Sequence, residues 1–563
     1  MAKSWLKTMA LMLITTILVG LLVGCESKGT SSSDSANKTE TSTTEDSTQT
    51  KQEEKKGSSQ TDASTVAGIE GFVPFEKQVE IEIPVYDRSI EGLPPVDDNY
   101  WTRWVQSEFG DKYNIKVTYV AIPRSDEVTK FNMLIAAGTS PDIVFHYDYP
   151  QAVTYAEQGA LQEIDMELFK HIAPTYYQNM VDNDILKYCE LNGKNMFVMA
   201  RRPEAYNYVT LIRQDWIEAV GMEMPENYEE YCALLDAWKA EGICEYPVAL
   251  SLPTSGYVTN HIYRDFPLDE KELALYSDLT VASLPWEPTY KLLKRQNEEY
   301  NKGYINPEYY LDSDGSQAKA DFIAGKVGIY GNYLSHDSDY VLGLMENFPD
   351  AELAVLSPYA TLEEGQVPAS RAYWPFGMII GFSSQSSPEE VKATMMLLEW
   401  MSQEENLFTL QNGIEGLTYE LDENGLPVMK EYTGEERMNY NSNKDMYCLV
   451  IEGKDYGSEE ANLQVQKTTF APPGFEYLIE QNYKYITETK KYSYPDYLFS
   501  TSIPEVAEYS ATLLSKWQEY SVALTTCKPE EFDALYEQFS KEYLEAGYQE
   551  ILDARLAAYE KDQ

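Results

Sequence analysis

Residues 131–144 read FNMLIAAGTSPDIV, and this stretch contains a helix, its end and a strand in succession. Apolar residues recur at the spacing of one helix face, which predicts a helix over 126–137. Gly138 can adopt a positive φ angle and Pro141 cannot continue a helix, so the helix is expected to end here. The apolar run that follows predicts a buried strand over 142–145.

Outward from this stretch the chain alternates strands and helices. The apolar pattern predicts strands over 79–86 and 115–121, with a helix over 99–109 between them. This β-α-β-α-β order favours an α/β fold with a parallel sheet. Ligands of such sheets bind at the carboxyl ends of strands, so residues 146–149, directly after the strand at 142–145, are candidate contacts.

A second α/β segment follows the first. Strands are expected over 208–213 and 326–330, with a helix over 228–241. An apolar strand over 376–382 then leads into a helix over 388–401. The C-terminal segment is expected to be helical. We expect the chain to return to the first α/β segment through the strand at 376–382.

The composition excludes several classes of protein. The chain has 563 residues, and its 92 Asp and Glu against 44 Lys and Arg give a net charge of −48. Such an acidic chain is not a nucleic-acid-binding protein. Hydrophobic residues make up 43% of it, which is enough for a large core. The four His residues have no metal-ligand spacing such as H-E-x-x-H, which excludes a His-rich metal centre.

The N-terminus has the layout of a lipoprotein signal peptide. Lys3 and Lys7 precede an uncharged run over 8–24, which ends in small residues directly before Cys25. This arrangement resembles the lipobox of bacterial lipoproteins, in which the Cys25 thiol would be diacylated and become the mature N-terminus. The alternative is an ordinary transmembrane anchor, since the run is just long enough to span a bilayer.

Residues 26–67 are Ser, Thr, Glu, Lys, Gln and Asp in the main, without aromatic residues, and predict a disordered tether. Five Cys follow Cys25, and no C-x-x-C occurs. We expect them to be buried free thiols. One disulfide, between Cys232 and Cys244, is the alternative in an exported chain.

Six ordered motifs carry a resemblance to a known family. They are FNMLIAAGTSPDIV (131–144), YAEQGALQEID (155–165), HIAPTY (171–176), LIRQDWIEAVGMEMPENYEEY (211–231), FIAGKVGIY (322–330) and NGIEGLTYELDENGLPV (412–428). Together they resemble the family 1 extracellular solute-binding proteins, in the large lipoprotein subgroup of sugar ABC importers. The resemblance runs from about residue 76 to the C-terminal helices.

The resemblance implies an α/β, two-lobed periplasmic-binding-protein-like fold of type II, in which two mostly parallel sheets are joined by crossover hinge strands. The expected division is a signal peptide at 1–24, a tether at 25–71, a first lobe at 72–200 and 372–460, and a second lobe at 201–371 and 461–563. It also implies a lipid-anchored receptor on the extracellular face of the cytoplasmic membrane. Such a receptor would bind a sugar, favoured as an oligosaccharide, and would deliver it to ABC permease subunits.

The sequence departs from the subgroup after residue 241. Many relatives carry an Asp-, Asn- and Gly-rich loop there that looks like a calcium site, whereas this chain reads GICEYP over 242–247. We predict no calcium at this loop. No cofactor is expected, and we expect a monomer.

Sugar sites combine flat aromatic rings with side chains that bond hydroxyl groups. By position near the lobe junctions, the candidate ligand contacts are Tyr147, Asp148, Arg201, Arg202, Tyr206, Tyr257, Trp286, Tyr333, Trp374 and Glu415. Each has a structural alternative: Trp286 and Trp374 as core residues, Tyr333 as a surface residue, and the two arginines as an ordinary ion-pair cluster at a crossover. Of these candidates, we expect Trp374 and Asp148 before the others to contact the ligand.

The competing functions are a cell-surface glycoside hydrolase, which two acids at hydrolytic spacing would permit, and a receptor for peptides or another non-sugar solute. A surface adhesin or scaffold fits the tether but not the two-lobed pattern. No nucleophile elbow, Walker loop, zincin motif or G-x-G-x-x-G occurs. We therefore expect a chain that is not an enzyme.

Overall fold

The computed structural model describes residues 71–90, 92–203, 208–253, 269–277, 281–334, 339–372, 374–438 and 444–563. Cys25, and nearly all of the segment expected to be a tether, lie outside this part of the chain. In the part of the chain that the structure describes, no helix is long and apolar enough to cross a bilayer.

The α-helices are α2 (Tyr100–Val105), α3 (Asp111–Tyr113), α4 (Glu127–Ala137), α5 (Tyr149–Glu157), α6 (Met166–Ile172), α7 (Pro174–Asp182), α8 (Gln214–Ala219), α9 (Tyr228–Ala240), α10 (Glu270–Tyr276), α11 (Glu287–Asn301), α12 (Ser316–Ile323), α13 (Asp339–Asn347), α14 (Pro388–Ser402), α15 (Glu404–Asn412), α16 (Lys444–Tyr447), α17 (Glu459–Phe470), α18 (Glu476–Thr489), α19 (Pro504–Thr526), α20 (Phe532–Tyr543) and α21 (Gln549–Asp562). The strands are β1 (Val79–Asp87), β2 (Ile115–Pro123), β3 (Ile143–His146), β4 (Glu190–Leu191), β5 (Lys194–Asn195), β6 (Val198–Arg201), β7 (Tyr208–Arg213), β8 (Ile329–Tyr333), β9 (Leu353–Val355), β10 (Ser370–Arg371), β11 (Phe376–Phe382), β12 (Tyr419–Leu421), β13 (Pro427–Met429) and β14 (Ser493–Tyr494).

The first β-α-β unit is confirmed. β1 and β2 pair in parallel over their whole length. The connection between them is α2, a π-helical turn at Gln106–Gly110, and α3. It begins with a capping box, in which the Asn99 side chain accepts from the backbone N–H of Thr102 and the Thr102 side chain accepts from the backbone N–H of Asn99. Local hydrogen bonds of Asn99 therefore hold the start of this helix where the sequence predicts it.

The strand β11 lies between β3 and β6 in a three-stranded sheet and runs antiparallel to both. β3 and β6 therefore point in the same direction and end at the same edge of the sheet. α4 leads into this sheet as predicted, and its C-terminal Gly138 has a φ of 70°.

The strand directions differ from the parallel arrangement expected from the order of strands and helices. β1 and β2 are parallel as expected, but β11 and its neighbours, and β7 and its neighbours, pair antiparallel. The reason is that β11 arrives from a distant part of the chain. The local order of elements sets the direction only of strands joined by one crossover.

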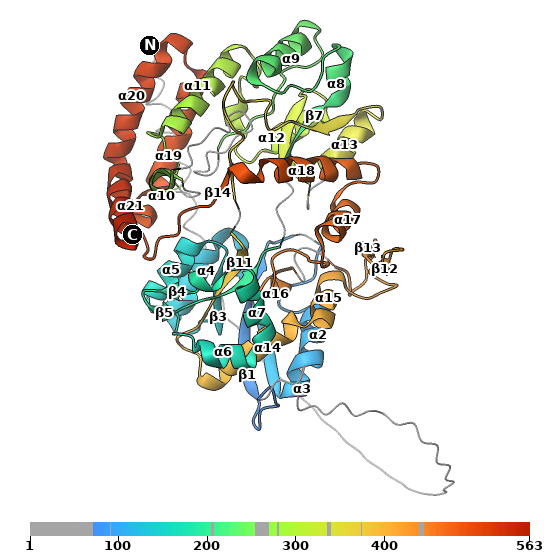
Figure 1. Cartoon of the computed structure of the whole chain (residues 1–563), viewed down its shortest axis with the longest axis vertical. Helices are drawn as coiled ribbons and strands as arrows, with labels where there is room; N and C mark the ends of the chain where they lie inside the picture. The colour runs from blue at the N-terminus through green and yellow to red at the C-terminus, as the bar shows by residue number, and fades with distance from the viewer. Residues whose placement is uncertain are drawn as a thin grey trace, which may run out of the picture. The chain divides into compact units, whose positions relative to one another are not determined.

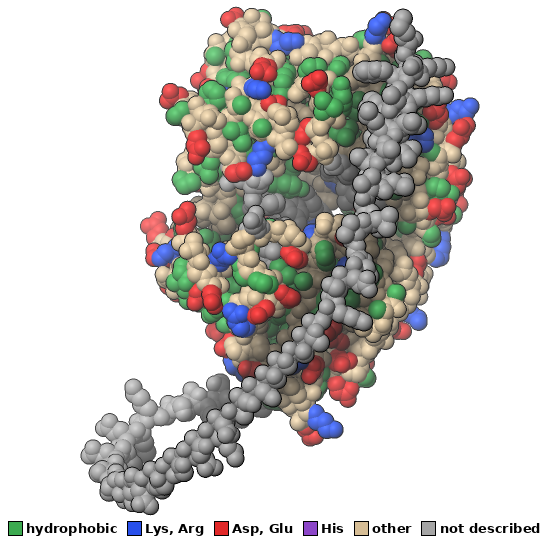
Figure 2. Space-filling model, turned by 180° about the vertical axis from the view of Figure 1, so that it is seen from behind, with side chains coloured by type: hydrophobic (Ala, Val, Ile, Leu, Met, Phe, Trp, Pro, Cys, Tyr) green, Lys and Arg blue, Asp and Glu red, His purple; other side chains and the backbone are tan. Residues whose placement is uncertain are grey.

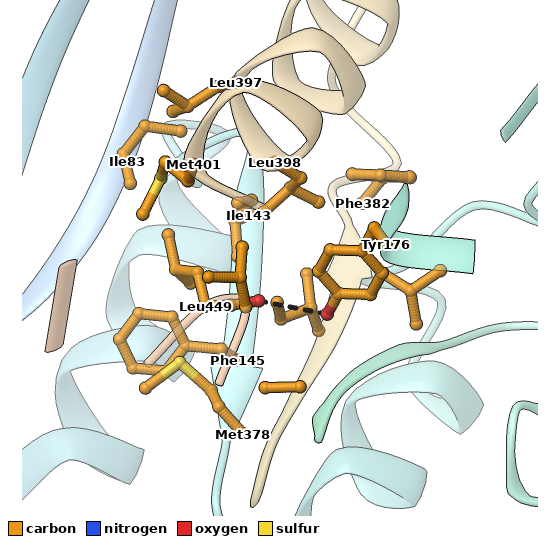
Figure 3. Packing of buried hydrophobic residues seen from close by; sticks show 14 of the residues in the cluster. Ile83, Ile143, Phe145, Tyr176, Met378, Phe382, Leu397, Leu398, Met401 and Leu449 are labelled. Atoms are coloured by element: carbon orange, nitrogen blue, oxygen red, sulfur yellow. Dashed lines mark hydrogen bonds between the residues drawn. The ribbon is translucent and has the colours of Figure 1, made fainter. Parts of the chain in front are cut away.

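The largest core surrounds the sheet of β3, β11 and β6. In Figure 3 Phe145 of β3 packs among residues that include Leu398 of α14. The Tyr176 hydroxyl of α7 donates a hydrogen bond to the Leu449 carbonyl oxygen at 3.0 Å. Figure 1 shows α5, α6, α7 and α14 around these strands. This core joins residues from both sides of the long excursion between β6 and β11.

A second three-stranded sheet has the order β8-β7-β9. β7 has the predicted bounds, but β8 begins at Ile329, three residues after the predicted start at Lys326. Gly328 explains the shift, because a Cβ atom there would lie 2.4 Å from the ring of Trp238. The chain passes close to this buried ring before the ladder of β8 with β7 begins.

The predicted C-terminal helices are confirmed, and they cover two different cores. Leu478 and Ile479 of α18 belong to the core of the β8-β7-β9 sheet. α19, α20 and α21 instead pack with α11, where Leu513 and Trp517 contact the cluster that includes Leu292. The segment after residue 458 therefore adds to the second sheet and its flanking helices.

All five cysteines in the described part of the chain are free thiols. Cys189 and Cys448 are buried, and Cys232, Cys244 and Cys527 are half-buried. The alternative of a Cys232–Cys244 disulfide is therefore wrong. Burial raises the pKa of the Cys244 thiol to about 11, so this thiol is protonated at neutral pH and behaves as a small apolar group.

A buried carboxylate lies on α11. Glu299 is fully buried, and neither of its carboxylate oxygens accepts a hydrogen bond of normal geometry. The buried hydroxyls of Tyr228 and Tyr231, on α9, are also without a hydrogen-bond partner. Burial raises the pKa of Glu299 to about 8, although the charges of Arg295 and Lys302 oppose the shift. The folded protein thus keeps a proton that the unfolded chain releases at lower pH.

We expect Glu299→Gln to stabilise the protein at pH 8 and to have little effect near pH 5. Between the usual pKa of Glu and the raised value, the folded state binds more protons than the unfolded state, so the free energy of unfolding falls as pH rises by about 1.4 kcal/mol per unit. Thermal unfolding at the two pH values measures the effect. Glu298→Gln, at the exposed neighbouring position, is the control, and equal stability of Glu299→Gln and wild type at pH 8 would contradict the prediction.

Candidate functional site

Side chains from the strand ends of two sheets, β1-β2 and β3-β11-β6, meet at one place. β1 carries Tyr86 near its end, and Tyr147 follows β3 directly. The two rings stack at 6.0 Å with an interplanar angle of 28°. Arg124, directly after β2, places its guanidinium 4.8 Å from the Tyr86 ring centre and 5.9 Å from that of Tyr147. We call this meeting point the strand-end cluster. We include in it Arg201, the last residue of β6, and Arg202, which follows directly.

An ion pair between Arg88 and Asp445 contacts the cluster through Tyr147. Both terminal nitrogens of Arg88 donate to the Asp445 carboxylate, whose side chain is 1% exposed. The Tyr147 hydroxyl donates to Asp445 Oδ1 at 3.2 Å. Burial, with the nearby Cys448, Asp445 and Glu452, raises the pKa of Tyr147 well above its usual value. Tyr147 is therefore a neutral hydroxyl whose proton is directed at a buried carboxylate.

A second carboxylate holds the end of β3. His146 Nδ1 accepts from the Asp148 N–H at 2.9 Å, and His146 Nε2 lies 3.2 Å from Glu127 Oε1. Arg124 pairs with the same Glu127 oxygen. Burial raises the pKa of Glu127, but His146, Tyr86 and Arg124 outweigh it, and the net shift is downward. Glu127 is thus ionised beside His146, and the His146 ring fixes the backbone N–H of Asp148.

Asp148 lies where the end of β3 meets a crossover of the chain. Arg371 of β10 pairs with Asp496, which follows β14. Burial raises the pKa of Asp148; His146 and Arg371 oppose the shift, and Asp496 adds to it. Burial also raises the pKa of Asp496, against the effect of Arg371. Two carboxylates therefore share the field of one guanidinium here.

Both arginines after β6 are in ion pairs. Arg201 Nη1 donates to Asp455 Oδ2 at 2.6 Å. Arg202 donates from Nε and Nη2 to Glu452 Oε2 at 3.0 and 2.6 Å. The Glu452 N–H also donates to the Arg201 carbonyl oxygen at 2.8 Å. This arrangement matches the structural alternative of a crossover ion-pair cluster, and whether a ligand contacts either arginine stays a prediction.

Two aromatic groups flank these polar residues. Trp374 is half-buried, stacks on Phe376 at 5.9 Å and meets Tyr188 edge to face at 5.2 Å. At the start of β7, Tyr208 is 52% exposed and meets the half-buried Tyr333 of β8 edge to face at 5.0 Å. Each group presents part of an aromatic face at the point where the chain leaves one sheet for the other.

Of the remaining predicted contacts, the structure describes Trp286 and Glu415. Trp286 is 5% exposed, donates from Nε1 to Glu272 at 2.7 Å and stacks on Tyr276. Glu415 is exposed in the turn before β12. Tyr206 and Tyr257 lie outside the described residues, as does Cys25. The structure thus brings Tyr147, Asp148, Arg201 and Arg202 to the strand ends, encloses Trp286 in a small core with Ala369 and Tyr494, and leaves Glu415 exposed.

Sequence reasoning missed Asp445, Asp496 and Tyr208. Asp445 and Asp496 lie in segments without a periodic pattern, so no sequence signal places them beside β3. Tyr208 is the first residue of a predicted strand at a crossover, and this position could have indicated a ligand contact. In the described part of the chain, no group of three or more His, Cys, Asp or Glu is arranged to hold a metal ion.

Comparison with known proteins agrees with this architecture. A family model for bacterial extracellular solute-binding proteins matches residues 95–395. Lipoprotein LipO of Bacillus subtilis (strain 168) is 23% identical over 364 residues, which are 60% of this chain and 69% of the relative. This family consists of solute receptors, not enzymes.

Solved structures share the fold at low sequence identity. An HMO-binding, ABC-transporter-associated solute-binding protein from Bifidobacterium longum infantis ATCC 15697 has a TM-score of 0.62 at 14% identity, over 86% of this chain and 98% of that one. The alginate-binding protein AlgQ2 has a TM-score of 0.59 at 15% identity, over 87% and 99%. The two-lobed periplasmic-binding-protein-like fold is therefore confirmed.

We expect Asp445→Asn to destabilise the protein by about 3–5 kcal/mol, because it removes the buried carboxylate that accepts from both terminal nitrogens of the largely buried Arg88. Urea unfolding measures the loss. Glu108→Gln, which removes an exposed ion pair with Lys112, is the matched control and should cost no more than about 1 kcal/mol. Equal losses in the two variants would show that the Arg88 pair does not support the cluster.

Proposed function

Because the chain belongs to the bacterial extracellular solute-binding proteins, we propose that it is a lipid-anchored receptor that binds an oligosaccharide and delivers it to an ABC import permease. The observation that carries the proposal is the strand-end cluster, with half-exposed aromatic groups beside it on both sheets. Carboxylates and hydroxyls that bond sugar hydroxyls, next to flat rings that pack on sugar C–H faces, are what such a ligand requires. HMO and alginate, named for two proteins of the same fold, are carbohydrates as well.

We place the ligand between the lobes, with Tyr147, Asp148 and Trp374 on the first and Tyr333 on the second. Tyr208 joins this set as a further candidate because of its exposure and its contact with Tyr333. Ligands of α/β sheets bind outside the carboxyl ends of strands, and Tyr147 and Asp148 follow such an end.

The proposed lobes are 72–200 with 372–460, and 201–371 with 461–563. The separate cores support this division: one contains residues up to β6 and from β11 to Ile451, and the others contain residues from β7 to Ala360 and from α18 onward. We place the crossovers near 199–208 and 356–374. The ion pairs of Arg202 and Arg371 lie at these crossovers.

Ligand binding would shift an equilibrium between open and closed lobes toward the closed form. A ligand can shift that equilibrium only by the difference in its affinity for the two states. Bonds to Asp148 on one lobe and packing on Tyr333 of the other would exist together only when the lobes are closed. The closed form would be the one that the permease recognises.

The anchor would be a diacylated Cys25 on the extracellular face of the bacterial cytoplasmic membrane, with 25–71 as the tether. Two acyl chains bind a bilayer stably where a single chain binds only reversibly. The receptor itself would catalyse nothing and act as a monomer. Transport would require separate permease and ATPase subunits.

The proposal predicts that an oligosaccharide raises the melting temperature of the full-length protein in detergent without being cleaved. A ligand that binds only the folded state adds about 2.7 kcal/mol of stability at a concentration of 100 Kd. A panel of mono- and oligosaccharides, polyols and peptides, read by thermal shift and followed by chromatography of the sugars, measures both points. A shift for peptides alone would reject the sugar ligand, and sugar cleavage would favour the hydrolase.

Trp374→Ala should weaken binding of the sugar found in this panel by at least about tenfold, or about 1.4 kcal/mol, because it removes an aromatic face that packs on the ligand. Isothermal titration measures the loss. Tyr310→Ala is the matched control. It removes an aromatic ring that is 36% exposed and lies away from the crossovers, and it should leave affinity unchanged. Wild-type affinity in the Trp374 variant would identify Trp374 as core packing.

Cys25→Ala should abolish labelling with the fatty-acid analogue, because no thiol remains for acylation. The variant should be found either as soluble protein or as a precursor that keeps its signal peptide. Fractionation of cells and metabolic labelling with a fatty-acid analogue measure the change. Cys244→Ala is the control and should remain labelled and anchored. A Cys25→Ala protein that still carries the label would refute the lipoprotein assignment.

A further inference from the structure

The arginines that a charged sugar would need are already neutralised at the strand-end cluster. Carboxylate groups are bound in proteins chiefly by arginine, through paired N–H donors. Arg201 donates from Nη1 to Asp455, and Arg202 donates from Nε and Nη2 to Glu452, in pairs whose side chains are largely shielded from solvent. Each of these two guanidinium charges is thus balanced by a carboxylate of the same chain.

The same holds on either side of these two residues. Arg88 gives both terminal nitrogens to the buried Asp445, and Arg371 pairs with Asp496 at the β10–β14 crossover. Among the described residues of these segments, each arginine at a strand end or crossover has a carboxylate partner of its own chain. A ligand carboxylate would meet guanidinium groups whose positive charge is already balanced, and it would add a second negative charge beside the carboxylate in place.

Carboxylates, in contrast, are in excess. Asp148 is an additional acid beside the Arg371–Asp496 pair, so this corner of the cluster has two carboxylates for one guanidinium. The surroundings add to the effect, since the chain has a net charge of −48 and Figure 2 shows Asp and Glu side chains spread over one face with fewer Lys and Arg among them. Such a field repels anionic ligands and attracts hydroxyl donors to fixed acceptors.

We propose that the receptor selects uncharged oligosaccharides and rejects those that carry carboxylates, because its strand-end arginines are paired internally and Asp148 supplies a surplus acceptor. This inference rests on the proposed function and names the class of sugar that the site takes. Hydroxyl groups of the sugar donate to the carboxylates of Asp148 and Asp496, and its C–H faces pack on the aromatic rings. Sequestered guanidinium groups fix the shape of the site and do not bind the ligand.

The test compares sugars that differ only at C6. Cello-, manno- and galacto-oligosaccharides are titrated into the full-length protein in detergent beside their counterparts with the C6 hydroxymethyl groups oxidised to carboxylates. Binding of at least one neutral series, with its oxidised counterpart weaker by at least about tenfold, supports the inference. Equal or tighter binding of an oxidised series overturns it and leaves the sugar receptor intact. Binding of no series overturns the proposed function and this inference together.

A variant in which Arg201 loses its carboxylate partner should bind oxidised sugars better than wild type does. Asp455→Asn removes the charge that faces Arg201, and it should narrow the difference between neutral and oxidised sugars by roughly tenfold or more. Asp184→Asn, which breaks the exposed pair with Lys187, is the control and should leave the difference unchanged. An Asp455→Asn protein that rejects oxidised sugars as strongly as wild type would show that pairing of Arg201 does not set the selectivity. Wild-type titrations decide the inference if this variant does not fold.

Discussion

The architecture depends on the insertion of β11 between β3 and β6. All seven residues of β11, Phe376–Phe382, are buried, and its two neighbours both precede the long excursion that separates β6 from β11 in the chain. Because β11 runs antiparallel to both, β3 and β6 end at one edge, and Tyr147, Asp148 and Arg201 arrive there together. A strand without a polar residue thus determines where the polar residues meet. It also closes the excursion that contains the second sheet, so the crossovers are bound to the first core.

Charge at this edge is organised by pairing. Buried ion pairs add little net stability over apolar residues of similar size, because desolvation offsets most of the attraction. Their effect is geometric: Asp445 receives both Arg88 and the Tyr147 hydroxyl, so the ring that stacks on Tyr86 is fixed in one orientation. At this edge each arginine is paired with one acid, so the acid in excess is Asp148, whose backbone N–H donates to His146 Nδ1.

Most of the elements could be predicted from sequence, and most of their partners could not. β7 and the helix α4 follow from periodicity because apolar spacing reports which face a residue buries. The pairing of β11 could not be derived in direction, since strand pairing across a long excursion leaves no local pattern. For the site, Asp148 was predictable as a residue after a strand, whereas Asp445 and Asp496 are brought to it by distant segments. Trp286 shows the limit of reading an aromatic residue by position, since a hydrogen bond to Glu272 and a stacked Tyr276 enclose it.

The fold alone does not determine the ligand, since AlgQ2 shares this architecture at 15% identity and is named for alginate, an acidic polysaccharide. If this chain takes uncharged sugars, as we propose, two receptors of one fold differ in the charge of their ligands, and side chains at the strand ends are where we place the difference. An arginine there can pair with a carboxylate of its own chain or with a ligand. In this chain Asp455 and Glu452, which follow the first core and carry no ligand-binding pattern, pair with Arg201 and Arg202. Specificity in such a receptor is then set by the partners of the binding residues as much as by the binding residues themselves, and a single acidic position outside the site can change it without changing the sheet.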